Sequence, residues 1–96
     1  MTFDDLQKAL QVLGLEERAT LKEIKRRHRD LVKQHHPDRN HACDPKIIRQ
    51  VNAAYKLLLE YVAEYHFSFA EDEFYEQNPQ ERLRRQFDND PLWGKR

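Results

Sequence analysis

The stretch His35-His36-Pro37-Asp38-Arg39-Asn40 divides this 96-residue chain between two long segments with helical periodicity. Pro37 ends any helix that arrives from the N-terminal side, because its ring removes a backbone donor and disfavours helix at the preceding residue. A tight polar turn between two helices holds its side chains at an exposed tip, where binding residues are often found. The stretch therefore predicts a helical hairpin whose tip is a candidate binding site.

Apolar residues recur at three- and four-residue steps on both sides of this turn, which predicts an all-α fold. The helix before the turn, about residues 20–35, starts at a capping box of Thr20 and Glu23. The helix after it, about residues 45–66, starts at Asp44-Pro45. We expect these two helices to form an antiparallel pair, crossed by an N-terminal helix at about residues 3–13. The longest apolar stripe follows the turn and comprises Ile48, Val51, Tyr55, Leu58, Val62 and Tyr65.

The C-terminal third has a different composition, acidic and aromatic. Ser68-Phe69-Ala70-Glu71 has the pattern of a capping box, and Asn78-Pro79-Gln80-Glu81 that of another helix start. We expect one or two short helices here, with Leu83 and Phe87 as their buried residues. The predicted organisation is a core at residues 1–66 and an extension at residues 67–96 that packs on it, because a disordered tail contains few aromatic residues. The sequence leaves open whether the chain is a whole protein or an excised domain.

Charge is unevenly distributed along a chain whose 17 basic and 17 acidic residues balance. From Thr20 to Asn40, seven Lys and Arg residues oppose three acidic ones, a net charge of +4. From Glu60 to Asp90, nine acidic residues oppose three arginines, a net charge of −6. The basic segment is therefore expected to meet an acidic partner.

The single cysteine, Cys43, excludes an intrachain disulfide and indicates a reducing compartment. Asp4 and Asp5 interrupt any N-terminal signal pattern, and no apolar run approaches the ~20 residues of a membrane span. We therefore expect a cytoplasmic monomer without membrane contact.

Two chemical interpretations of the tip find little support. His35, His36, His41 and Cys43 could be metal ligands, but their spacing matches none of the common zinc sites. His36 with Asp38, or Cys43 with a histidine, could form a catalytic pair, but the tip of a helical hairpin is a poor place to exclude water. We expect no metal, no cofactor and no small-molecule substrate.

The third interpretation is recognition, and here the chain resembles a J domain, the co-chaperone module typified by DnaJ. The resemblance covers about residues 8–59 in unbroken order. A His-Pro-Asp tripeptide alone occurs often by chance, but its position between a basic helix and an apolar helix is specific. The matching residues are Ala9 to Leu15, Ala19-Thr20, Glu23-Ile24-Lys25, Leu31, His36 to Asn40, and Val51 to Leu58.

The resemblance implies a domain that binds a DnaK-type seventy-kilodalton heat-shock chaperone and stimulates its ATP hydrolysis. Such a domain activates a partner ATPase and is not itself an enzyme, and the chain has no glycine-rich phosphate-binding loop. The residues implied to contact the partner are His36, Pro37 and Asp38 at the tip, Lys25 and Arg29 on the basic helix, and Arg39, Asn40 and Arg49 beside them.

The sequence also departs from the family pattern. His28 replaces a usual tyrosine and is expected to be a partly buried packing residue, and Asp30 replaces a usual basic residue and lowers the charge of the binding face. Tyr55→Ala is expected to lower the free energy of unfolding by about 3–5 kcal/mol if that ring lies in the core.

The alternative functions are a basic helix that binds nucleic acid, which the acidic tail would disfavour, and a purely structural helical adaptor.

Overall fold

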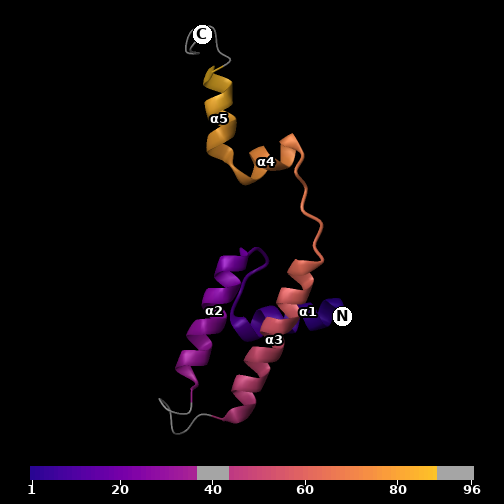
Figure 1. Ribbon diagram of the computed structural model, residues 1–96, viewed down its shortest axis with the longest axis vertical. Coiled ribbons are helices and arrows are strands. Elements are labelled where there is room, and N and C mark those ends of the chain that lie inside the picture. Colours follow the sequence, from indigo (N-terminus) through magenta and orange to yellow (C-terminus); the bar gives the residue numbers. More distant parts are fainter. Residues whose placement is uncertain (37–43, 89–96) are drawn as a thin grey trace. The chain divides into compact units, whose positions relative to one another are not determined.

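The computed structural model describes residues 1–36 and 44–88, and these residues contain five helices and no strand. The helices are α1 (Phe3–Leu13), α2 (Leu21–Gln34), α3 (Pro45–Ala63), α4 (Glu71–Gln77) and α5 (Pro79–Asp88) (Figure 1). The all-α prediction is confirmed. The chain divides into two compact units, Met1–Tyr65 and His66–Arg96.

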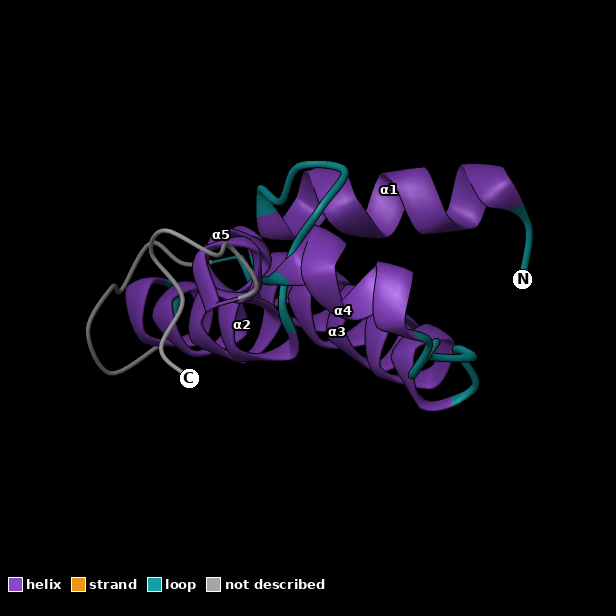
Figure 2. Ribbon diagram, turned by 90° about the horizontal axis from the view of Figure 1, so that it is seen from above, coloured by secondary structure: helices purple, strands orange, loops and turns teal. Residues whose placement is uncertain are grey.

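The first unit has the predicted arrangement of its three helices. Helices α2 and α3 lie side by side in opposite directions, and α1 crosses them (Figure 1). Seen from above, α1 occupies a layer of its own beside the α2–α3 layer (Figure 2). Each long helix therefore turns one apolar face toward a common core.

Side-chain caps explain where these three helices start. At α2, the Glu23 amide donates to the Thr20 hydroxyl (3.1 Å) and the Thr20 amide donates to the Glu23 carboxylate (3.0 Å), so the predicted capping box is confirmed. An equivalent box joins Thr2 to Asp5 at α1. At α3, Asp44 accepts from the backbone of the first turn, as predicted. The amides that start each helix are thereby partly satisfied.

The core is small and is made by all three helices. Tyr55 is only half-buried beside it, whereas Ala54 on the same helix is buried. The predicted apolar stripe of α3 therefore lies on the side of the helix that faces the core, but the residues of α3 that are buried are Val51, Ala54 and Leu58. The buried residues are Ala9, Leu13, Ile24, Val51, Ala54 and Leu58.

Helix α3 ends at Ala63, so the prediction of helix to residue 66 was wrong. Near its end the hydrogen-bond spacing tightens, with the Tyr65 amide donating to the Val62 carbonyl (3.2 Å), and the helix does not continue. Tyr65 is consequently exposed and is not part of the core stripe.

In the second unit, both predicted short helices form, and α5 begins at Pro79 as the Asn78-Pro79 signal predicted, but the side chains of Ser68 and Asn78 do not act as N-caps. Helix α4 begins at Glu71 after Ala70, whose methyl side chain cannot cap it. The Ser68 hydroxyl accepts from the Ala70 amide (3.3 Å) rather than from the Glu71 amide. The Asn78 side chain donates to the Phe74 carbonyl (2.9 Å), so it closes α4 rather than capping α5. The predicted capping box at Ser68 was therefore wrong.

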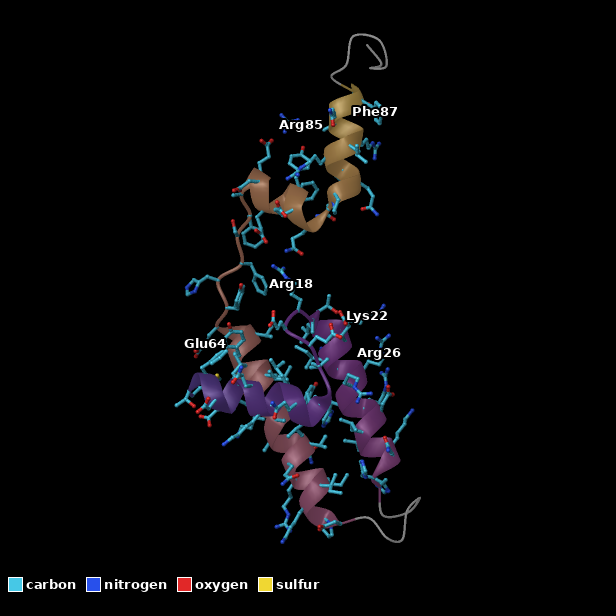
Figure 3. All side chains as sticks on the ribbon, turned by 180° about the vertical axis from the view of Figure 1, so that it is seen from behind. Arg18, Lys22, Arg26, Glu64, Arg85 and Phe87 are labelled. Atoms are coloured by element: carbon cyan, nitrogen blue, oxygen red, sulfur yellow. The ribbon has the colours of Figure 1, made fainter. Side chains whose placement is uncertain are left out.

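The second unit is held together by polar contacts. The Arg85 guanidinium donates to Glu71 (2.6 Å) and to the Tyr75 hydroxyl (3.2 Å), which raises the pKa of Arg85 through these two hydrogen bonds, the Tyr75 bond contributing most. Arg85 and Phe87 lie on opposite sides of α5 (Figure 3). Leu83 and Phe87, predicted as buried, are 56% and 54% exposed because α5 turns its charged side toward α4. The packing of this unit on the core stays a prediction.

Candidate functional site

Helix α2 separates an apolar side from a basic side. Ile24 is buried and Leu31 is half-buried, and residues at these three- and four-residue steps share the face toward the core. Lys22 and Arg26 extend from the side of α2 that is turned away from α3 (Figure 3). The basic face of α2 is defined by its five exposed cations, Lys22, Lys25, Arg26, Arg29 and Lys33.

The basic face of α2 is not neutralised within the described part of the chain, where none of its five cations forms an ion pair. Lys25, Arg29 and Lys33 follow one another at four-residue steps. Like charges at this spacing destabilise a helix by about 0.2–0.5 kcal/mol per pair. The arrangement therefore costs stability in the free protein, and an acidic surface would relieve that cost.

The predicted binding residues divide according to where the structure places them. Lys25 and Arg29 share the basic face of α2, and His36 is exposed two residues after the end of that helix. Arg49 is also exposed but stands on α3. The remaining four predicted residues, Pro37, Asp38, Arg39 and Asn40, lie outside the described residues.

The metal interpretation finds no site among the residues that the structure describes, where no group of three or more His, Cys, Asp or Glu side chains is arranged to hold an ion. His41 and Cys43 lie outside that part of the chain. The same residues include no helix long and apolar enough to cross a membrane.

His28 joins α2 to α3 beneath the basic face. Its ring stacks on Tyr55 with centroids 3.8 Å apart and planes 6° apart, and its Nε2 is 2.9 Å from the side-chain oxygen of Asn52. The prediction that His28 is a partly buried packing residue is confirmed. Its partner Asn52 was not foreseen, since an exposed polar residue on a long helix carries no signal of a cross-helix contact.

Arg27 is not part of the basic face, because its side chain binds the end of α1. Its Nε donates to the Leu13 carbonyl at the end of α1 (2.8 Å), and its side chain is half-buried. In the sequence, Arg27 is one of the seven basic residues between Thr20 and Asn40. Asp30, by contrast, is exposed and forms no ion pair within the described residues, so it lowers the charge of α2 as expected.

Comparison with known proteins identifies the family of the first unit. The family model of the DnaJ domain matches residues 3–64, which include α1, α2 and α3. The chain belongs to the DnaJ domain family. The resemblance found in the sequence is thereby confirmed, and residues 3–64 are hereafter called the J domain.

Two curated proteins illustrate the similarity of this J domain. The chaperone protein DnaJ of Ureaplasma parvum is 44% identical over 48 residues, which are 50% of this chain and 13% of that protein. The chaperone protein DnaJ of Mycoplasmopsis pulmonis is 39% identical over 49 residues, again 50% of this chain and 13% of that protein. The similarity thus covers only a small part of each relative. No solved structure matches the chain significantly.

Proposed function

We propose that this J domain binds a DnaK-type seventy-kilodalton heat-shock chaperone and stimulates its ATP hydrolysis. In this proposal the chain activates a partner ATPase and catalyses no reaction itself. The supporting observation is the basic face of α2, whose five cations form no ion pair with the residues that the structure describes, on a helix that ends two residues before His36 in a chain of the DnaJ domain family.

Electrostatics supplies the physical basis of the proposed docking. The residues of α2 comprise six basic and two acidic side chains, a net charge of +4. An acidic surface on the chaperone would attract this helix, orient it during encounter and remove the repulsion among its cations. The proposed attraction is largely screened beyond the Debye length, about 8 Å at physiological salt, so stimulation should weaken as salt rises.

The tip supplies the specific contact in this proposal. His36, Pro37 and Asp38 follow the C-cap residue of α2, His35, in the sequence, and the proposal assigns the contact after the basic face to them. Asp38 carries a negative charge beside a positive helix, and it is expected to engage a basic group of the chaperone. Because His36 is exposed, its replacement should leave the core intact.

Single-turnover ATP hydrolysis by a DnaK-type chaperone tests the proposal. The wild-type chain should accelerate hydrolysis, and His36→Gln should abolish the acceleration without changing the melting temperature. Arg29→Ala should weaken binding about 1.5-fold to 5-fold, which corresponds to the ~0.2–1 kcal/mol of an exposed ion pair.

Arg84→Ala is the matched control, because Arg84 is an exposed arginine on α5, outside the J domain. It should stimulate as the wild type does. Failure of the wild-type chain to accelerate hydrolysis by several DnaK-type chaperones, or full acceleration by His36→Gln, would overturn the proposal.

A further inference from the structure

The six cations of α2 are of two kinds. Five of them form the exposed basic face, whereas Arg27 is half-buried and bonded to another helix. Arg27 follows Ile24 by three residues and precedes Leu31 by four, so it stands beside the side of α2 that faces the core. Its neighbours Arg26 and Arg29 are both exposed.

The end of α1 explains why a cation is held there. The last four carbonyls of a helix have no partner within it, and the helix dipole makes that end negative. The last turn of α1 contains no basic residue of its own. Arg27 supplies the missing charge from α2, with its Nε 2.8 Å from the Leu13 carbonyl.

Gly14 provides the space that the guanidinium needs. It ends α1 with a φ of 68°, the left-handed conformation that a Cβ disfavours. A Cβ built on Gly14 would lie 3.0 Å from the Nη2 atom of Arg27. The absence of a side chain at Gly14 therefore serves two purposes, the backbone turn and the approach of Arg27.

The Arg27–Leu13 hydrogen bond holds α2 against α1, and these two helices otherwise have few contacts with each other. Both α1 and α2 pack mainly on α3, so rotation of α2 about its own axis is restrained by the core on one side. The Arg27–Leu13 hydrogen bond adds a restraint on a second side. Any rotation that broke it would also turn the basic face away from its present direction.

We propose that Arg27 is a positioning residue for chaperone binding: it holds α2 in the rotation that presents the basic face, and it does not itself touch the partner. This inference rests on the proposed function. Two other roles are possible for such an arginine: it could be one more cation that contacts the partner, or it could be needed only for the stability of the domain.

Binding of a DnaK-type chaperone in the presence of ATP, measured over a range of salt concentrations, separates these roles. The full-length variants are Arg27→Met and its neighbour Arg26→Met, each measured at a temperature where circular dichroism shows a fully folded chain. Concentrations above ~0.1 M salt limit the Debye length to ~10 Å, so that charges outside the contact are screened.

Arg26→Met, which removes a docking cation, should reduce the dependence of affinity on salt. Arg27→Met should weaken binding by about threefold to fivefold, comparable to the loss of one exposed ion pair, with the salt dependence unchanged. A reduced salt dependence in Arg27→Met would make Arg27 a docking residue, and unchanged affinity of the folded variant would make it purely structural. Either result overturns the inference.

Arg27→Lys provides a second variant in case Arg27→Met does not fold. It keeps the charge at the end of α1 but lacks the planar guanidinium, so it should recover part of the lost affinity. Recovery of none, in a chain that is folded, would contradict positioning through the Leu13 carbonyl. If the wild-type chain binds no DnaK-type chaperone, the proposed function fails, and this outcome is distinct from all those above.

Discussion

The contact between His28 and Tyr55 offers the sharpest test of how the helical pair is held together. The two rings are nearly parallel with centroids 3.8 Å apart, and Nε2 of His28 lies 2.9 Å from the Asn52 side-chain oxygen. One residue of α2 therefore makes two different contacts with α3. Replacing His28 and Tyr55 by alanine, singly and together, isolates the ring contact.

The expected energies follow from these contacts. An aromatic pair contributes about 0.5–1.5 kcal/mol beyond burial, and a neutral hydrogen bond about 0.5–1.5 kcal/mol. His28→Ala removes both and should lower the free energy of unfolding by about 1–3 kcal/mol. Tyr55→Ala should cost about 2–3 kcal/mol, less than the loss of a core ring, because Tyr55 is only half-buried. The double variant should then reveal a coupling energy of about 0.5–1.5 kcal/mol.

Urea unfolding followed by far-ultraviolet circular dichroism measures each free energy at a single pH. A cycle that pairs Arg26→Ala with Tyr55→Ala is the matched control, since Arg26 lies on the exposed side of α2, and it should be additive within about 0.3–0.5 kcal/mol. Equal additivity in the His28–Tyr55 cycle would refute the argument that the ring contact ties α2 to α3. A cycle of His28→Ala with Asn52→Ala tests the hydrogen bond in the same way.

Three further predictions concern the helix ends and the extension. Hydrogen bonds from Thr20 lower the folded pKa of Glu23, so their stabilisation is complete above about pH 4.5 and is lost as pH falls through the folded value; Glu23→Gln should flatten this part of a melting-temperature profile against pH. Gly14→Ala should cost about 1–2 kcal/mol by urea unfolding, since the left-handed conformation then carries a Cβ against Arg27. Truncation after Phe67 should lower the melting temperature if the extension packs on the core, as the sequence predicts, and an unchanged temperature with raised chaperone stimulation would favour shielding of the basic face instead.

The positions of the three long helices could be predicted from local signals. Thr20 and Glu23 form their capping box within one turn, and Gly14 takes its positive φ for reasons of backbone geometry alone. Such signals depend on residues three or four apart, so they are present in the sequence before any tertiary contact forms. Ser68 and Asn78 show the limit, because each has alternative backbone partners and the sequence does not indicate which one it takes.

Part of the candidate site could also be predicted. The basic face of α2 follows from helical spacing, whereas Pro37 and Asp38 of the tip lie outside the described residues, so the tip stays a prediction. Arg49, predicted as a flanking contact, is exposed on α3, the helix in which the sequence placed it.

The sequence by itself determined that this chain is an all-α member of the DnaJ domain family with an uneven charge, because periodicity, caps and motif are local properties. Only the tertiary structure distinguished among chemically similar residues. Arg27 and Arg26 are adjacent arginines, yet one binds the end of α1 and the other faces solvent. His28 contacts Asn52 and Tyr55 only when α2 packs against α3. Such roles depend on contacts between residues 14 or more positions apart, which no local pattern encodes.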